Sequence, residues 1–217
     1  MNEKVVVLDF ETTGLSPDRG DRATEIGAVV LEQGEVVDRF QSLMNAGVGI
    51  PAFVQSLTGI TNRMIADAPP AEQVMRAFAE FVDDMPLVAH NASFDKRFLD
   101  TEFRRVGIRR KGRFACSMRV ARRIYPNARN HKLNTLARYM GLDWSGRHHR
   151  AMADVEMTTR LWCAMQQRIA HDYGLESVPH RLMRDLQSTP ASGVRTLVRK
   201  FARRQDIHPE TVAESMK

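Results

Sequence analysis

The sequence has little of several features that would each point to a particular class of protein. It contains only two cysteines, Cys116 and Cys163, each in apolar surroundings and neither at metal-ligand spacing from a partner. We expect two small buried hydrophobic residues rather than a disulfide, because a cytosolic chain of 217 residues needs no cross-link. No apolar run reaches the roughly 18 residues that a membrane span requires. The short apolar stretch near the N-terminus runs directly into acidic residues, which is unlike a signal peptide. The sequence therefore predicts a cytoplasmic protein with no membrane segment.

Acidic residues are scarce in the middle of the chain. Residues 96–150 contain 16 Lys and Arg but only 3 Asp and Glu, whereas residues 1–95 contain 6 Lys and Arg and 15 Asp and Glu. Single basic side chains often only solvate a helix face, but this asymmetry favours a protein that holds cations in one place and a polyanion in another. Few aromatic residues lie between the basic ones, so we expect contacts with backbone phosphates more than with stacked bases. The basic groups are 109–113, 119, 122–123 and 129–132.

The apolar pattern predicts strands first and then strands that alternate with helices, which is typical of an α/β domain with a mixed sheet. Gln33 and Gly34 fit a two-residue hairpin turn, and residues 45–70 are expected to be rich in loops. Beyond Gly174 the pattern changes, so we expect a domain at 1–174 and a basic helical extension at 175–217. The expected strands are 4–10, 25–32, 35–43, 86–90 and 114–116, and the expected helices are 70–84, 93–106, 118–125, 132–140, 151–172, 178–186 and 194–204.

In the stretch VVVLDFETTGL at residues 5–15, an apolar strand ends in two acids separated by one residue, and the stretch contains no Lys or Arg to neutralise them. Side chains alternate along a strand, so Asp9 and Glu11 point to the same face and repel each other unless they are protonated or share a cation. Mg²⁺ and Mn²⁺ prefer such oxygen ligands. Taken alone, the pair is better explained as two exposed acids at a strand end, because the motif is too short to indicate a function by itself. Gly14 then permits an unusual backbone angle or the close approach of a ligand.

Two further acids follow at the expected boundaries of other elements. Asp95 ends the motif HNASFD after the strand at 86–90, and Asp154 ends the motif HRAMAD early in the last long helix. Together with LDFETTGL, EIGAVV and LTGIT, these motifs occur in the order seen in the DEDDh-type 3′–5′ exonucleases. Over about residues 4–170 the sequence resembles that family, in particular the proofreading epsilon subunits of bacterial DNA polymerase III and their stand-alone relatives.

The resemblance implies a ribonuclease H-like mixed five-stranded sheet flanked by helices, with a two-metal site for Mg²⁺ or Mn²⁺. It assigns the general base to His149, five residues before Asp154, rather than to His148. A histidine with an ordinary pKa of ~6.5 suits that role. In the other subclass a tyrosine stands four residues before that Asp, and here the position is Arg150. The implied metal ligands are Asp9, Glu11, Asp95 and Asp154, with Glu11 also catalytic because it holds the metal that carries the attacking water.

The resemblance also implies contacts with the terminal nucleotide of the substrate. Leu15 and Ile60 would lie against its base, although for these residues and for Phe94 a place in the hydrophobic core is an open alternative. The complete set is Thr12, Thr13, Gly14, Leu15, Ile60, Asn91 and Phe94.

Three functions stay open. The favoured one is a metal-dependent 3′–5′ exonuclease that acts on single-stranded or frayed 3′ ends of DNA and releases nucleoside 5′-monophosphates. A DNA polymerase or another replication or repair protein is its expected partner. The second is a 3′–5′ exoribonuclease with the same chemistry. The third is a non-catalytic nucleic-acid-binding polymerase subunit, although all five expected active-site positions carry the residue types that catalysis requires.

Overall fold

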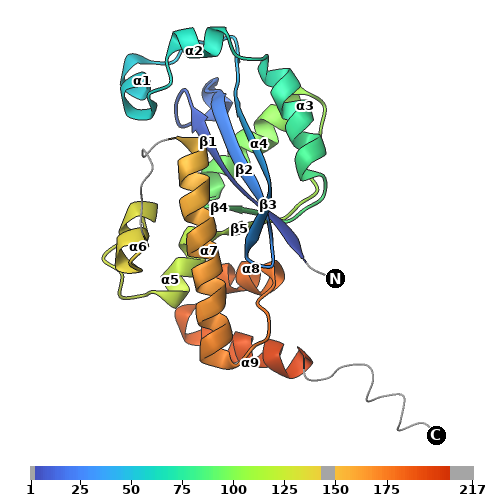
Figure 1. Cartoon of the computed structure of the whole chain (residues 1–217), viewed down its shortest axis with the longest axis vertical. Helices are drawn as coiled ribbons and strands as arrows, with labels where there is room; N and C mark the ends of the chain where they lie inside the picture. Colours follow the sequence, from blue (N-terminus) through green and yellow to red (C-terminus); the bar gives the residue numbers. More distant parts are fainter. Residues whose placement is uncertain (1–2, 143–149, 206–217) are drawn as a thin grey trace, which may run out of the picture.

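A computed structural model describes residues 3–142 and 150–205 of the chain. Its centre is a five-stranded sheet with the strand order β3-β2-β1-β4-β5 (Figure 1). Strand β1 pairs antiparallel with β2 and parallel with β4, so the sheet is mixed, as the sequence predicts. The strands are β1 (Lys4–Thr12), β2 (Ala23–Glu32), β3 (Glu35–Leu43), β4 (Leu87–Ala89) and β5 (Phe114–Cys116).

The turn between β2 and β3 confirms the predicted hairpin. Gln33 and Gly34 both have positive φ, 52° and 87°. A two-residue turn with positive φ at both positions matches the twist of the strands that it joins.

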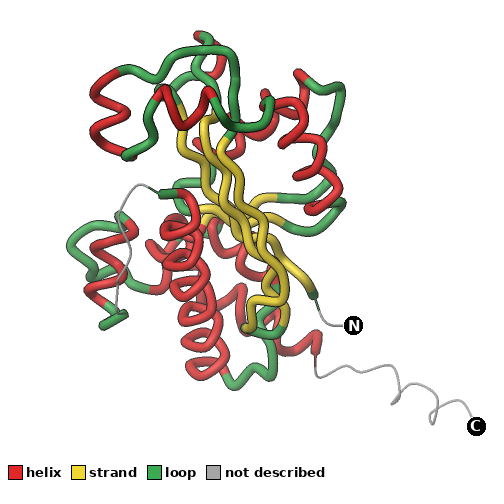
Figure 2. Tube along the Cα trace, turned by 45° about the horizontal axis from the view of Figure 1, so that its top comes forward, coloured by secondary structure: helices red, strands yellow, loops and turns green. Residues whose placement is uncertain are grey.

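Helices cover both faces of the twisted sheet (Figure 2). Alternate residues of β1 face the two layers, because side chains alternate along a strand. Val6 and Leu8 pack with α3 and α4 on one face, and Val5 and Val7 pack with α5 to α9 on the other. The longer helices are α3 (Ala71–Val82), α4 (Ser93–Arg105), α5 (Ser117–Ile124), α6 (Leu133–Tyr139), α7 (Ala151–Tyr173), α8 (His180–Ser188) and α9 (Val194–Gln205).

Residues 45–70, which were expected to be loop-rich, also contain two short helices, α1 (Ala52–Thr58) and α2 (Asn62–Ala66). Two of the residues that suggested loops, Pro51 and Gly59, lie at the ends of a helix instead. Pro51 precedes the first turn of α1, and Gly59 ends that helix with a φ of 72°. The Thr61 side chain accepts a hydrogen bond from the backbone N–H of Met64 at 3.2 Å and so caps α2.

The last two described helices pack against the rest of the fold. Leu182 and Val198 belong to the same apolar cluster as Val5 and Trp162. The Gln187 side chain accepts a hydrogen bond from the backbone N–H of Cys116 at 2.7 Å, which satisfies part of the exposed edge of β5. The division of the chain at 174/175 stays a prediction, and α8 and α9 contribute to the core on one face of the sheet.

Two expectations about absent features have simple outcomes. Cys116 is buried, Cys163 is partly exposed, and both are free thiols, so the pair forms no disulfide. Within residues 3–142 and 150–205, no helix is both long and apolar enough to cross a membrane.

Candidate active site

Three carboxylates meet where β1 reaches the first turn of α7. Asp9 and Glu11 are two residues apart on β1 and point to the same face, while Asp154 is the fourth residue of α7. One oxygen from each of the three carboxylates lies within 4.8 Å of the other two. The sheet and α7 therefore bring together residues that are more than 140 positions apart in the sequence. Such a set of hard oxygen donors can hold a divalent metal ion.

Asp95 joins this group from the opposite side of the sheet. It lies in the first turn of α4, directly after β4, and is 1% exposed. Its Oδ1 accepts a hydrogen bond from the backbone N–H of Phe10 at 3.2 Å, and Phe10 is the residue between Asp9 and Glu11. The structure therefore places all four acids that the sequence singled out at one end of β1.

The electrostatics of the four acids show a site built for positive charge. Burial, followed by repulsion from Asp95, Asp154 and Glu11, raises the pKa of Asp9 well above its ordinary value. Burial and the negative charge of Asp154 raise the pKa of Glu11 to about 8. Burial raises the pKa of Asp95 to about 7, against the opposing effect of its backbone hydrogen bonds. Carboxylates placed this close together ionise fully only when cations are bound among them.

A fifth carboxylate, that of Glu25, lies next to the site and was not predicted. It is directly opposite Glu11 on β2 and is 1% exposed. Its carboxylate accepts two hydrogen bonds from the guanidinium group of Arg150, at 2.9 and 3.1 Å. The predicted hairpin did not contain this signal, because the turn at 33–34 sets the register of β2 against β3, where Glu25 pairs with Leu43. Glu25 lies opposite Glu11 because of the register between β1 and β2, which no local pattern specified. The contact between Arg150 and Glu25 could not be predicted from the sequence, because it depends on where α7 meets the sheet.

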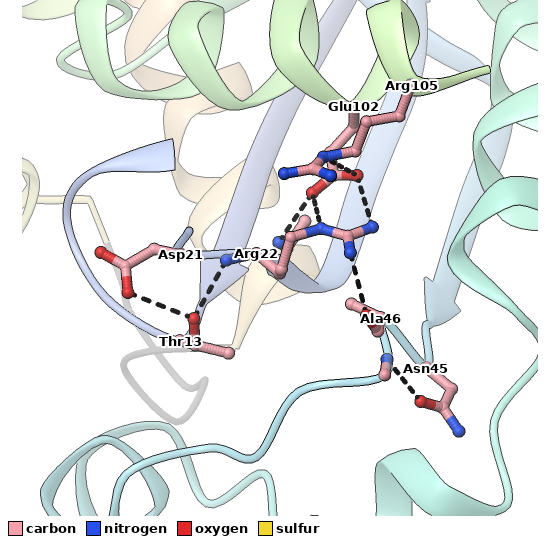
Figure 3. A network of polar contacts seen from close by, with 9 residues as sticks. Thr13, Asp21, Arg22, Asn45, Ala46, Glu102 and Arg105 are labelled. Atoms are coloured by element: carbon pink, nitrogen blue, oxygen red, sulfur yellow. Dashed lines mark hydrogen bonds and ion pairs between the residues drawn. The ribbon is translucent and has the colours of Figure 1, made fainter. Parts of the chain in front are cut away.

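The loop after β1 is held by a second network of polar contacts (Figure 3). The backbone N–H of Arg22 donates to Oγ1 of Thr13 at 3.0 Å, and the backbone N–H of Ser16 donates to Asp21 at 2.8 Å. The guanidinium group of Arg22 donates two hydrogen bonds to Glu102 of α4, at 2.8 and 3.0 Å. The loop of Thr12–Leu15 is therefore tied to the helix that carries Asp95.

The residues implied to contact the terminal nucleotide differ in how exposed their side chains are. Leu15 is 76% exposed, so the core alternative is wrong for this residue. Asn91 is exposed, with a φ of 64°, and Phe94 is partly buried against Phe98 at a ring-centroid distance of 4.9 Å. Thr12 donates its hydroxyl to the carbonyl of Gly14 at 2.6 Å, which folds the loop back on itself.

Ile60 lies in the hydrophobic core, which was one of the two alternatives for this residue. It is 0% exposed and packs in a small apolar cluster with Ile50, Val54 and Ile65. The core alternative therefore holds for Ile60 in this structure, because α1 and α2 enclose its side chain. His149, the expected general base, lies outside the described residues, and so does His148.

The structure divides the basic segment between the two ends of the sheet. The carbonyl of Arg113 accepts a hydrogen bond from Leu87, which is level with Val6 at the start of β1. At ~3.3 Å per residue, Glu11 lies roughly 16 Å further along the strand, so residues 109–113 are remote from the acids. Arg119 lies in the first turn of α5, after β5, and β5 runs parallel to β4 toward the site end. Among the residues of the basic segment on this side, Arg119, Arg122, Arg129 and Lys132 are exposed.

A mixed five-stranded sheet with clustered carboxylates at the end of its central strand defines a ribonuclease H-like nuclease. The RNase_T exonuclease family model matches residues 6–162. The chain therefore belongs to the exonuclease family.

Several relatives are PolC-type DNA polymerases III. The protein from Bacillus cereus is 39% identical over 164 residues, which are 75% of this chain and 11% of that protein. The protein from Bacillus subtilis is 39% identical over 165 residues, which are also 75% of this chain and 11% of that protein. The chain thus spans only about a tenth of the length of the relatives that it matches.

Solved structures with the same fold include exonuclease X in complex with 5′-overhanging duplex DNA. It is 26% identical with a TM-score of 0.67, and the match covers 84% of this chain and 99% of that one. The nuclease domain of 3′hExo, a DEDDh family member bound to rAMP, has a TM-score of 0.68 at 20% identity, over 82% of this chain and 96% of that one. Escherichia coli exonuclease I in complex with a dT13 oligonucleotide has a TM-score of 0.67 at 17% identity, over 79% of this chain and 43% of that one. The last two likenesses show the fold alone.

Proposed function

We propose that the protein hydrolyses the terminal phosphodiester bond at single-stranded or frayed 3′ ends of DNA and releases nucleoside 5′-monophosphates. The observation that carries this proposal is the cluster of Asp9, Glu11 and Asp154, whose carboxylate oxygens lie within 4.8 Å of one another. A phosphodiester brings further negative charge to this cluster, so the reaction requires cations there.

The residues present fit two divalent ions, Mg²⁺ or Mn²⁺. The pKa values of Asp9, Glu11 and Asp95 are raised because burial and mutual repulsion outweigh the nearby charge of Arg150 and the backbone hydrogen bonds of Asp95. Asp9 would contribute to holding both ions, Glu11 and Asp154 would hold one of them, and Asp95 would hold the other. Bound there, the two ions would neutralise charge on the phosphate and acidify a water molecule.

Residues of the chain itself accept a proton and hold the substrate in position. His149 accepts the proton of the attacking water, for which an imidazole with an ordinary pKa of ~6.5 is suited at neutral pH. Thr12, Thr13, Gly14 and Leu15 contact the terminal nucleotide from the loop that Arg22 holds against α4. The side chain of Leu15 is 76% exposed and offers an apolar surface to the base of the terminal nucleotide. Asn91 and Phe94 contact the same nucleotide from the residues around the start of α4.

DNA is the proposed substrate because the relatives named above are DNA polymerases III and exonuclease X is bound to DNA in its structure. A polymerase or another replication or repair protein is the proposed partner. RNA is the competing substrate, supported by the fold shared with 3′hExo, which was solved with rAMP. A nucleic-acid-binding subunit without catalysis is the third candidate.

One assay separates these candidates. The protein is incubated with 5′-end-labelled single-stranded DNA and RNA of the same sequence, with Mg²⁺, Mn²⁺ or EDTA. Stepwise shortening from the 3′ end, faster on DNA, is expected with either metal and is abolished by EDTA and by Asp9→Ala. Faster shortening of RNA would select the exoribonuclease. An intact label with both metals, together with binding in a gel-shift assay, would select the non-catalytic subunit.

The role of His149 has a separate test. His149→Ala should lower kcat by about 10²–10⁴-fold, the usual contribution of general-base catalysis. Mn²⁺ affinity, measured by calorimetry in the absence of DNA, should stay close to that of the wild type. His148→Ala is the matched control, and equal losses in the two variants would contradict the assignment.

A further inference from the structure

The environment of Glu25 shows how closely the start of α7 is fixed to the sheet. Besides the two hydrogen bonds from Arg150, its carboxylate accepts one from the backbone N–H of Ala151 at 3.2 Å and one from the Gln41 side chain at 3.0 Å. Arg150 is the residue before α7, and Ala151 is the first residue of that helix. One buried carboxylate on β2 thus receives three hydrogen bonds from the first residues of the element that carries Asp154.

Gly27 brings the same two elements into backbone contact. It lies two residues after Glu25 on β2 and therefore faces the same side of the sheet. A Cβ atom at this position would lie 2.8 Å from the carbonyl carbon of Ala151 and 2.8 Å from the backbone nitrogen of Met152. The first turn of α7 therefore rests directly on β2, and the hydrogen bonds of Glu25 fix its position along the strand.

Asp154 is about one helical turn after Ala151, so any displacement of the helix start moves its carboxylate. Asp154 lies beside Asp9 and Glu11, and Glu11 is directly opposite Glu25 across the β1–β2 ladder. Strand β2 thus contacts both elements that carry the three carboxylates. It pairs with β1, which carries Asp9 and Glu11, and through Glu25 it binds the start of α7, which carries Asp154.

The chemistry of the pair favours a role in geometry over one in stability. Burying two charges costs desolvation free energy, and well-packed apolar residues are often at least as stabilising. A fifth carboxylate beside four others is also unfavourable unless a cation accompanies it. A guanidinium group that donates two parallel hydrogen bonds restricts both distance and angle, which apolar packing does not.

We propose that Glu25 and Arg150 are positioning residues for the metal site: their buried ion pair fixes the first turn of α7 and thereby places the Asp154 carboxylate beside Asp9 and Glu11. This inference rests on the proposed function, because it takes those three carboxylates as metal ligands.

The test compares Arg150→Ala, Arg150→Lys and Glu25→Gln with the wild type. The control is Arg39→Ala. It removes the ion pair between Arg39 of β3 and Glu156 of α7, at 2.9 Å. Both side chains of this pair are about half-exposed, and the pair lies outside the carboxylate cluster. Three quantities are measured: Mn²⁺ affinity of the protein without DNA, by electron paramagnetic resonance; kcat and KM on single-stranded DNA; and the melting temperature in EDTA. Glu25→Gln keeps an oxygen that can accept from Ala151, so it serves if Arg150→Ala does not fold.

Loss of the pair should weaken Mn²⁺ binding and lower kcat by about 10- to 100-fold each, as for other residues that orient metal ligands. KM should change much less than kcat, since none of these residues is placed against the nucleotide. Arg150→Lys keeps the charge but cannot donate the same paired hydrogen bonds, so it should recover only part of the loss. Arg39→Ala should leave both quantities close to the wild type.

Two results would overturn the inference. One is wild-type Mn²⁺ affinity and kcat in folded Arg150→Ala or Glu25→Gln. The other is full recovery by Arg150→Lys, which would mean that charge and not position is what matters. If the wild-type protein itself neither binds Mn²⁺ nor shortens DNA, the proposed function fails, and that outcome is distinct from both.

Discussion

Asp95 accepts a hydrogen bond from the backbone N–H of Phe10, at 3.2 Å, across 85 positions of sequence. The residues on either side of Phe10 are Asp9 and Glu11. One buried bond therefore fixes the N-terminus of α4 to the strand that supplies the other acids, and it leaves the second oxygen of Asp95 outside that bond.

Replacing Asp95 by asparagine separates this bond from the charge. The amide oxygen still accepts from Phe10, but the negative charge is lost. We expect nuclease activity to fall by about 10²–10³-fold, the size of effect seen when one charge-stabilising group leaves an active site. The free energy of unfolding of the metal-free protein at pH 8 should rise, because the carboxylate of Asp95 is ionised there at a cost that burial imposes on the folded state and that the neutral amide avoids. Urea denaturation in EDTA measures this, and a variant less stable than the wild type at pH 8 would contradict it.

The stability of the metal-free protein should depend on the protonation of Glu11. Its pKa is raised to about 8 in the folded protein, so the folded state binds a proton that the unfolded state releases near pH 4.5. The stabilisation of the folded state by this proton is fully present below pH 4.5 and is lost as the pH rises to about 8. Mg²⁺ should therefore raise the melting temperature more at pH 8 than at pH 5.5.

His90 is partly buried, and desolvation lowers its pKa to about 4, so its effect on stability has the opposite direction as the pH falls. The measurement therefore takes the difference between wild type and Glu11→Gln at each pH. An equal response of the two proteins to pH and Mg²⁺ would count against the role of Glu11.

Gly27→Ala should disturb the site through the backbone of α7. The new methyl group would lie 2.8 Å from Ala151 and Met152, so the helix start must move. Overpacking of this kind typically costs about 1–3 kcal/mol. We expect that loss in urea denaturation, together with a lower kcat. Gly49→Ala is the control, because its Cβ would have only the Asn62 side chain within 4 Å, at 3.8 Å.

Arg22→Ala should be strongly destabilising because it leaves the Glu102 carboxylate buried. The Glu102 side chain is 2% exposed, and its remaining cationic neighbour is Arg105 at 3.8 Å. Removing one partner of a buried pair costs about 3–5 kcal/mol, and Arg105 should keep the loss near the lower value. Lys111→Ala, which removes an exposed pair with Asp83, should change the free energy of unfolding by less than about 0.5 kcal/mol. Similar losses in the two variants would contradict this account of Arg22.

Salt should weaken DNA binding through the basic residues at the site end of the sheet. Each phosphate contact contributes about one unit to the slope of log K against log salt concentration, so Arg119→Ala and Arg122→Ala should each lower the slope by up to about one. Arg109→Ala and Arg113→Ala, at the opposite end, are the controls. Fluorescence anisotropy with labelled single-stranded DNA in EDTA measures the slope, and a wild-type slope near zero would exclude phosphate tracking.

Most of the fold could be predicted from the sequence because its elements have strong local signals. The hairpin depends on a two-residue turn, and residues 35–43 and 114–116 form the strands expected there. The short helices α1 and α2 were missed because proline and glycine act as breakers or as caps according to what lies beside them. For Ile60 the sequence left both a substrate contact and a core position open, since an apolar side chain looks the same in sequence whether it is exposed or enclosed.

By itself, the sequence determined the alternation of β1, which puts Asp9 and Glu11 on one face, and the positions of Asp95 and Asp154 at the starts of helices. These follow from the period of a strand and from local helix signals. Only the tertiary structure decided that Glu25 and Arg150 meet beside that face and that residues 109–113 lie at the far end of the sheet. Those facts depend on strand order and on where α7 contacts β2, which are set by long-range packing that no local pattern encodes.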